Sequence, residues 1–233
     1  MPLLASRIIL ASCVVLATAG CGSTNYGSPQ TTSSTSKPSK PMAVTAPKPD
    51  PDLTKQLGTS GAGLTTAGCV FGSYPLETAE HVKDVNDLKF KSFPPTSGTH
   101  FAIWATPGVY DQPVGDGFAV HNLEHGGVVA WLGTDVEDAT VTAVNDVPKQ
   151  GQKWLVAPRT DLAGLFSAAW GLGLSCPPPA LAKLDEATLA KGLKAWYDAV
   201  NSTGSDAEKD VPAYAGAMKE PTPKRDISEA APF

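Results

Sequence analysis

The strongest constraint on the fold is an apolar run that follows directly after a polar, histidine-containing motif. The run is Val128–Leu132, and it is bounded by Gly126–Gly127 before it and by Gly133 after it. A short, continuous and β-branched run of this kind is typical of a strand buried in the centre of a sheet. The motif that precedes it, His121–His125, therefore places coordinating side chains directly against the core.

The rest of the folded part predicts a small single α+β domain with a central, mainly antiparallel sheet. Apolar residues at helical spacing, with charges between them, predict one clear C-terminal helix over residues 180–200. A second helix is expected over residues 135–146. Further strands are expected at three β-prone stretches, Leu88–Phe90, Lys153–Ala157 and Leu165–Leu172.

The N-terminus reads as an export signal. Arg7 is followed by a largely apolar run, Ile8–Ala19, that is too short to span a bilayer as a stable helix. Residues 1–20 are therefore expected to be a signal peptide. Cys21 follows a small-residue cleavage pattern that resembles the bacterial lipoprotein signal, which predicts lipidation of Cys21 and attachment to the outer, extracytoplasmic face of the cell membrane. The alternative is an ordinary cleaved signal with an incidental cysteine.

Composition divides the remaining chain. Residues 21–63 are rich in Ser, Thr, Pro and Gly, so we expect a disordered tether that follows the lipidated cysteine. Residues 64–211 are expected to form the globular domain, and residues 212–233 a loose tail. Five of the 18 basic residues and two of the 23 acidic residues precede residue 64, which leaves a net charge of −8 for the rest. This balance argues against nucleic-acid binding and against a basic membrane-docking face.

Two cysteines remain in the folded part, Cys69 and Cys176. An even pair in an exported domain is most simply one disulfide. It would close a loop of about 107 residues, worth up to ~4–5 kcal/mol in the chain-entropy model. The rival interpretation has two thiolates helping to bind a metal, without the CxxC spacing that such sites favour.

All four histidines of the chain fall within 45 residues. His121 and His125 are four apart, so on a helical turn both imidazoles lie on one face and can bind a single ion. A proline-stiffened loop, residues 94–100, would bring His100 to the same place, and His81 would complete a set of four. Imidazoles without thiolates suit copper(II) or zinc. The alternative is a hydrogen-bonded core or substrate-binding role.

The motif His121–His125 also reads as H-x-x-E-H, the signature of a class of zinc peptidases in which Glu124 would be the general base. That signature needs a long helix, whereas Gly126–Gly127 ends any helix at once and a strand follows. Those peptidases are also larger and use a distant Glu ligand. We therefore interpret the match as mostly coincidental.

Three blocks of sequence do resemble a known family. They are Pro94–His100, Gly108–Asp111 and Val120–Val129, and the later Ala168–Gly171 is similar to the family's C-terminal segment. Together they resemble the domain-of-unknown-function family numbered 3105, over residues 65–200. His81 matches a further histidine of the family pattern. The resemblance implies an exported or membrane-attached domain and supplies no reaction.

Three functions remain open on the sequence alone. The first is a membrane-anchored lipoprotein that binds copper or zinc as a carrier, sensor or sequestering module. The second is a metal-dependent enzyme, a zinc hydrolase or copper oxidoreductase, with Glu124 as general base or as the partner that orients an imidazole. The third uses the histidines as a buried polar network in a domain that meets a protein partner of the cell envelope.

Overall fold

The computed structural model describes residues 40–201 and 221–227. Its core is a seven-stranded sheet with the strand order β1-β8-β7-β5-β6-β4-β9, in which four neighbouring pairs are antiparallel and two are parallel. The strands are β1 (Val70–Ser73), β4 (Gly108–Val109), β5 (Val128–Leu132), β6 (Trp154–Pro158), β7 (Leu165–Ala169), β8 (Leu172–Cys176) and β9 (Arg225–Asp226). The expected α+β domain with a mainly antiparallel sheet is confirmed.

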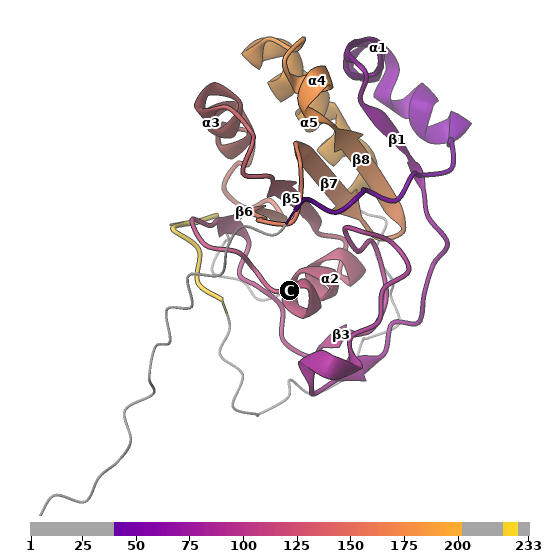
Figure 1. Cartoon of the computed structure of the whole chain (residues 1–233), viewed down its shortest axis with the longest axis vertical. Coiled ribbons are helices and arrows are strands. Elements are labelled where there is room, and N and C mark those ends of the chain that lie inside the picture. The colour runs from indigo at the N-terminus through magenta and orange to yellow at the C-terminus, as the bar shows by residue number, and fades with distance from the viewer. Residues whose placement is uncertain (1–39, 202–220, 228–233) are drawn as a thin grey trace, which may run out of the picture. The chain divides into compact units, whose positions relative to one another are not determined.

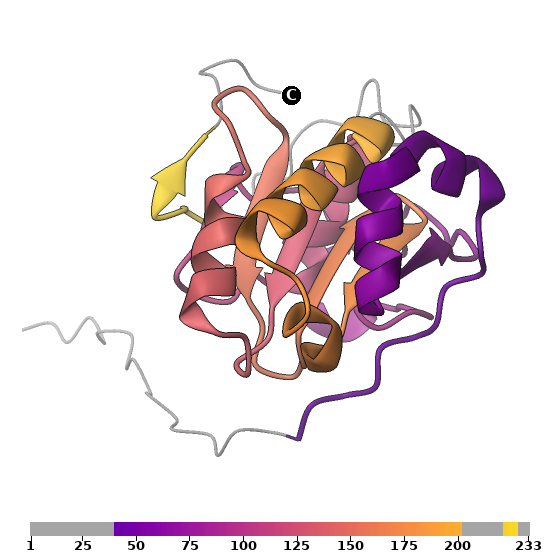
Figure 2. The same ribbon diagram turned by 90° about the horizontal axis from the view of Figure 1, so that it is seen from above.

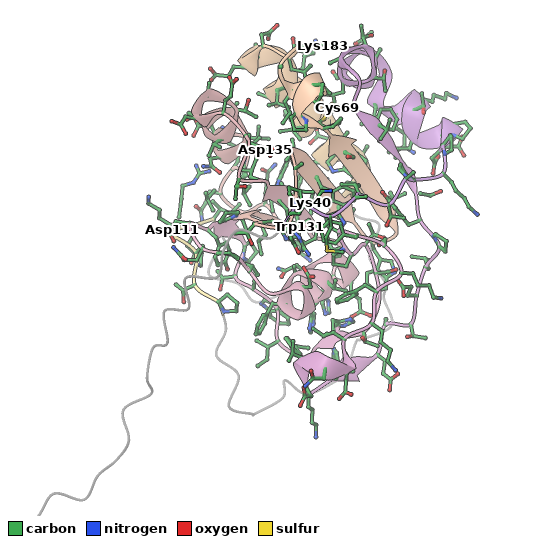
Figure 3. All side chains as sticks on the ribbon, viewed as in Figure 1. Lys40, Cys69, Asp111, Trp131, Asp135 and Lys183 are labelled. Carbon is green, nitrogen blue, oxygen red and sulfur yellow. A yellow bond between two sulfur atoms is a disulfide. The ribbon has the colours of Figure 1, made fainter. Side chains whose placement is uncertain are left out.

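The central strand is β5, as its sequence predicts. All five of its residues are buried, and it pairs in parallel with β6 and antiparallel with β7. Side chains alternate between the two faces of the sheet, so Ala130 joins one apolar cluster while Val129 and Trp131 join the other. Figure 3 shows Trp131 in the interior of the molecule.

Helices cover one face of the sheet. These are α1 (Pro51–Ala67), α3 (Asp138–Asp146), α4 (Pro178–Leu181) and α5 (Glu186–Val200). They lie together on one side of the sheet in Figure 1, and Figure 2 shows α1, α5 and α3 crossing it side by side. The predicted helix at residues 135–146 is confirmed within three residues at its start.

The opposite face carries α2 (Asp116–Glu124), visible below the sheet in Figure 1. The rest of this side is irregular chain with a two-residue parallel pair, β2 (His81–Val82) and β3 (His100–Phe101), and the 3₁₀ turn η1 (Val85–Asp87). Among the described residues, no helix is both long and apolar enough to cross a membrane.

The tether prediction is wrong for the residues nearest the domain, because α1 begins at Pro51. The Asp50 carboxylate caps it by accepting a hydrogen bond from Leu53 N at 3.0 Å, and Pro51 occupies its first turn. Leu53, Leu57 and Leu64 are buried against the core. The Ser, Thr and Gly content of this segment is typical of a tether, but a few leucines at helical spacing are enough to bury it.

Close packing of α1 on α5 depends on one glycine. A Cβ atom at Gly192 of α5 would lie 2.6–2.8 Å from the side-chain carbons of Leu64, so the two helices approach each other there. The domain therefore starts before residue 64, and a chain cut at that point would lose most of α1.

Three other sequence expectations need correction. Leu88–Phe90 is not a strand, because the Lys89 N–H is bound by the Thr99 hydroxyl at 2.7 Å instead of a strand neighbour. The single strand expected over Leu165–Leu172 is a hairpin, β7 and β8, since Gly171 at φ +70° reverses the chain. The helix expected over residues 180–200 is two helices, because Asp185 caps the Thr188 N–H at 2.7 Å and starts α5 afresh.

The C-terminal tail is also more ordered than expected where it is described. Arg225–Asp226 forms β9 on the edge of β4, and Ile227 is only 2 % exposed. The predicted signal peptide and Cys21 lie outside the described residues.

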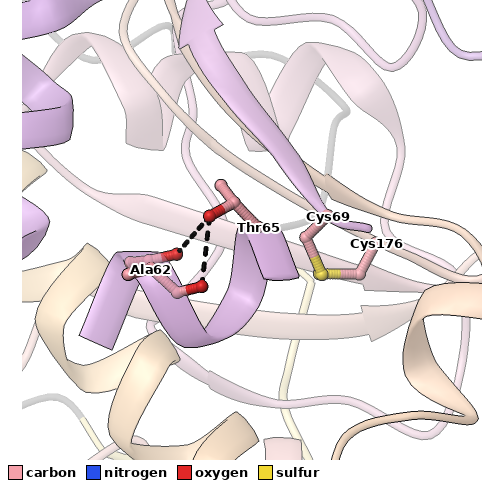
Figure 4. The surroundings of a disulfide bond; sticks show 5 residues. Ala62, Thr65, Cys69 and Cys176 are labelled. Atoms are coloured by element: carbon pink, nitrogen blue, oxygen red, sulfur yellow. Dashed lines mark hydrogen bonds between the residues drawn. A yellow bond between two sulfur atoms is a disulfide. The ribbon is translucent and has the colours of Figure 1, made fainter. Parts of the chain in front are cut away.

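The disulfide prediction is confirmed. Cys69 and Cys176 are joined by an S–S bond between the turn after α1 and the end of β8, and both residues are buried (Figure 4). The same view shows the Thr65 hydroxyl bonded to the carbonyls of Gly61 and Ala62 at 3.2 Å, inside the last turns of α1. The two cysteines are thus structural and give no thiolate to a metal.

Candidate metal centre

Three separate segments bring the histidines together on the α2 side of the sheet. His81 and His100 face each other in register across the β2–β3 pair. His121 lies in the last turn of α2, and His125 is the residue that caps this helix. None of the four comes from the central sheet itself, so their convergence depends on how loops and one short helix dock on it.

The loop before His100 is held by its own polar side chains. Residues 94–100 are all buried, and Thr96 N is bound by the Ser92 hydroxyl at 3.1 Å while Ser97 accepts from Glu77 N at 3.1 Å. Gly98 adopts φ +127°, and a Cβ there would lie 2.5 Å from the Lys89 carbonyl. Only glycine fits this position, which turns the Gly98 carbonyl toward the imidazole of His100.

The end of α2 follows from Gly126–Gly127, as expected. Gly126 is left-handed at φ +75°, and its N–H binds the Leu123 carbonyl at 3.1 Å. The Gly127 N–H binds the Asn122 carbonyl at 2.7 Å, which completes a Schellman motif. The helix therefore stops after nine residues and the chain enters β5, which rules out the long helix of the H-x-x-E-H peptidases.

Asn122 fixes the neighbouring loop to α2. Its side-chain oxygen accepts from Ala105 N at 3.0 Å, and its amide nitrogen donates to Ala105 O at 2.7 Å. This pair of bonds holds the segment that carries Trp104 against the helix. The indole of Trp104 lies 5.3 Å from the His121 ring and 5.7 Å from the His125 ring, between centroids.

The imidazoles form one cluster. Ring centroids are 5.0 Å apart for His81 and His100, 5.1 Å for His81 and His121, and 5.1 Å for His100 and His121. His125 stacks on His121 at 4.7 Å. His100 is fully buried and His121 is 2 % exposed, whereas His81 and His125 are half-buried, so the cluster extends from the interior toward the surface.

Backbone carbonyls determine the tautomers of two of these imidazoles. His100 Nδ1 lies 2.9 Å from the Gly98 oxygen, and His121 Nδ1 lies 2.5 Å from the Phe101 oxygen. A carbonyl oxygen only accepts, so each Nδ1 carries the proton and each Nε2 carries a lone pair. Metal-ligating histidines are typically oriented in this way, with the second ring nitrogen donating to a carbonyl.

Burial keeps His121 neutral. Desolvation lowers its pKa from 6.5 to about 3, the bond to the Phe101 carbonyl acts in the opposite direction, and the neighbouring imidazoles of His100, His125 and His81 lower it further. At neutral pH the ring is therefore an uncharged imidazole, the form that binds a metal ion.

Glu124 is a fully buried carboxylate that points into the cluster. Its Oε2 lies 2.8 Å from His100 Nε2. Neither carboxylate oxygen accepts a well-aligned hydrogen bond from the residues that the structure describes. His100 Nε2 also has no aligned hydrogen-bond partner among these residues. A lone pair thus faces a carboxylate in the interior, which is unfavourable unless a cation or an additional proton compensates it.

The four sequence-predicted histidines and Glu124 are therefore brought together. Two sets of three donors have their ligand atoms within 4.8 Å of one another: His81 with His100 and His121, and His121 with Glu124 and His125. Glu124 was expected to act as a general base or to orient an imidazole, whereas its oxygens lie among the imidazole nitrogens as possible ligands.

Some contributors were not expected from the sequence. Trp170 packs edge-on against His100 at 6.4 Å, from the turn between β7 and β8, and Trp104 covers the other side. The Phe101 and Gly98 carbonyls orient two rings. A backbone acceptor cannot be recognised from the sequence. The two tryptophans could have been considered, because Trp104 lies close to His100 and Trp170 lies within the block Ala168–Gly171.

The fold and this site define an α+β domain with a buried histidine–carboxylate cluster. Residues 81–191 match the sequence profile of a family described as "Protein of unknown function (DUF3105)", and this segment of the chain belongs to that family. The match begins at the first histidine of the cluster and contains all four of them. No curated protein and no solved structure matches the chain.

Proposed function

We propose that this protein binds a transition-metal ion, copper or zinc, through the histidine cluster, at the extracytoplasmic face of the membrane to which Cys21 anchors it. The observation that carries the proposal is the contact between His100 Nε2 and Glu124 Oε2 at 2.8 Å, with the His100 proton committed to the Gly98 carbonyl. A divalent cation converts this repulsive pair into two ligands.

The number of donors favours a binding role over catalysis. Two sets of three donors share His121 and are linked by the contact of His100 with Glu124, so a fourth protein donor lies beside either set. Catalytic zinc sites typically use three protein ligands and keep one position open for water or substrate. A carrier, sensor or sequestering module therefore fits the cluster better than a hydrolase does.

Metal analysis tests the proposal. The full-length chain, oxidised and without a polyhistidine tag, is incubated with copper(II) or zinc(II), dialysed and analysed for bound metal. We expect about one equivalent, and its loss in a His100→Ala/His121→Ala double variant, since both rings are ligands. A protein that retains neither metal would contradict the proposal.

The anchor has a separate test. Growth with a labelled fatty acid should label the wild-type chain, and a Cys21→Ser variant should remain unlabelled and leave the membrane fraction. Equal labelling of both would show that Cys21 is not the lipidated residue.

A further inference from the structure

We propose that the ion is copper(II) in tetragonal coordination and that Glu124 is one of its direct ligands. This inference rests on the metal-binding function proposed above and specifies the ion and the role of the carboxylate. It is carried by two donor–donor distances of the cluster.

Those distances match right-angled coordination. His100 Nε2 and Glu124 Oε2 are 2.8 Å apart, and His121 Nε2 and His125 Nε2 are also 2.8 Å apart. Two ligands with metal bonds of about 2.0 Å are about 2.8 Å apart at 90° and about 3.3 Å apart at the tetrahedral angle. Both pairs therefore have the separation of adjacent ligands in a square or octahedral arrangement.

The cluster holds one ion, although it contains two sets of donors. Both sets include His121, whose Nδ1 is committed to the Phe101 carbonyl, so this ring offers a single lone pair. The contact of Glu124 with His100 links the two sets. The two sets therefore cannot be filled independently, and an ion bound to His121 has donors of both sets beside it.

Neutral imidazoles do not explain both short distances. His125 Nε2 can donate a hydrogen bond to His121 Nε2, which accounts for that pair without a metal. His100 cannot donate to Glu124 in the same tautomer, because its proton binds the Gly98 carbonyl, and the pair is not aligned as a hydrogen bond. The pair that contains Glu124 is therefore the one that requires an added positive charge, which either a metal ion or a second proton on His100 supplies.

The donor types favour copper over zinc in this geometry. Tetragonal nitrogen and oxygen ligation is typical of copper(II) or nickel(II), whereas zinc prefers a tetrahedral arrangement. Copper(II) also binds a given nitrogen and oxygen site more tightly than the other divalent first-row metals. In the part of the chain that the structure describes, both cysteines are bonded to each other, so no thiolate competes to favour copper(I) or zinc.

Two indoles next to the ligands supply a readout. Trp104 lies 5.3 Å from His121 and Trp170 lies 6.4 Å from His100, between ring centroids. A paramagnetic copper(II) ion among these imidazoles should quench their fluorescence, and diamagnetic zinc should not. The titration therefore reports occupancy at this cluster and distinguishes it from binding elsewhere.

The experiment uses the full-length oxidised chain, titrated with copper(II) and zinc(II) separately and together. We expect fluorescence quenching that saturates at one equivalent of copper, displacement of zinc by copper, and an axial electron paramagnetic resonance spectrum with coupling to at least three nitrogens. Because the spectrum is recorded on the wild-type chain, this part of the test does not depend on any variant folding.

A matched pair of variants tests Glu124. Glu124→Gln should lower copper affinity roughly tenfold or more and change the axial parameters, while the number of coupled nitrogens stays the same. Glu137→Gln removes the same charge from the exposed cap of α3, on the other side of the sheet, and should leave affinity and spectrum unchanged. An unaltered spectrum in Glu124→Gln would overturn the ligand role.

The other outcomes separate this inference from the proposed function. Zinc bound more tightly than copper, with a tetrahedral cobalt(II) spectrum in the substituted protein, would overturn the inference and leave metal binding intact. Retention of no metal would overturn both, and would leave an imidazolium–carboxylate ion pair between His100 and Glu124 as the state of the cluster.

Discussion

The two faces of the sheet differ in what covers them. The face under α1, α3 and α5 is covered by apolar side chains on regular helices, with Leu193 and Trp196 of α5 fully buried. The face under α2 has an apolar cluster of its own, which includes Leu123 and Trp131, but the irregular chain over it also encloses four imidazoles and a buried carboxylate. The first face gains stability from removing apolar surface from water. The second buries polar groups that lower stability unless a ligand compensates them.

From this difference we expect the helical face to supply more of the stability of the fold and the α2 face to hold the proposed metal site. A carboxylate at 0 % exposure without an aligned hydrogen bond is tolerated only where the surrounding structure over-determines its position. The disulfide and the packing of α1 on α5 supply the stability that holds it there, and both lie on the opposite side of the sheet. Perturbations of the two faces should therefore have separable effects on stability and on metal binding.

The largest expected effect is the pH dependence of the metal-free protein. The folded-state pKa of His121 is lowered from 6.5 to about 3, so between these values the unfolded chain takes up a proton that the folded chain does not. Stability is therefore fully present above about pH 6.5 and falls toward pH 3, by on the order of 5 kcal/mol in total. Urea unfolding followed by tryptophan fluorescence, with a chelator present, measures this slope.

A His121→Gln variant is the control for that slope. Glutamine can still donate to the Phe101 carbonyl but does not titrate, so its stability should decline less steeply between pH 6.5 and 4. Identical slopes for the two proteins would show that His121 does not carry the polar face's pH dependence.

Truncating a core side chain tests the apolar face. Leu193→Ala on α5 should lower the free energy of unfolding by about 2–5 kcal/mol, because Leu193 is fully buried and its removal leaves a cavity. The metal content of the folded fraction should stay the same. A loss of metal binding at temperatures where the variant is folded would break the proposed separation of the two faces.

A smaller effect is expected where a guanidinium joins α2 to the sheet. Arg159 contacts both Asp116 oxygens at 2.5 and 3.1 Å and Asp161 at 2.8 Å, and it lies over the Trp131 ring at 5.5 Å. Arg159→Lys keeps the charge but loses the planar fork, and should cost about 1–2 kcal/mol in denaturant unfolding. Since Asp116 opens the helix that carries His121, metal affinity should fall as well, which a titration of both proteins would show.

The smallest effect is expected for a surface ion pair. Lys194 and Asp198 are 2.5 Å apart on α5, but their side chains are 68 % and 53 % exposed. Lys194→Ala should change the unfolding free energy by no more than about 0.5 kcal/mol and leave metal binding untouched. A larger change would mean that the exposed side of α5 contributes more to this face than its burial suggests.

Much of the sheet could be predicted because its strands are recorded as apolar runs. The bounds of β5 and β6 were predicted within a residue or two. The end of α2 before Gly126–Gly127 was also predicted, because glycine is the usual residue just after a helix C-terminus. Errors arose where one local interaction overrides a pattern. Gly171 at positive φ splits one apolar run into a hairpin, and the Asp185 cap divides one helix into two.

The candidate site was predictable in its members and not in its geometry. Scarcity of histidine pointed to the four rings, and the spacing of His121 and His125 placed them on one face. The depth of Glu124 in the cluster and the choice of tautomers depend on the Gly98 and Phe101 carbonyls, which belong to segments that only the tertiary fold brings near. Backbone acceptors are the same at every residue, so no sequence pattern announces them.

The disulfide also encloses the proposed metal ligands in one covalent ring. Cys69 and Cys176 are 107 positions apart, and His81, His125 and every proposed ligand between them lie inside the ring that this bond closes. The proposed ligands therefore belong to a covalent macrocycle that persists even when the helices unfold. Heat or denaturant can separate the donors only as far as the ring allows. Reduction of the disulfide opens the ring, so the donors could then separate further in the unfolded chain.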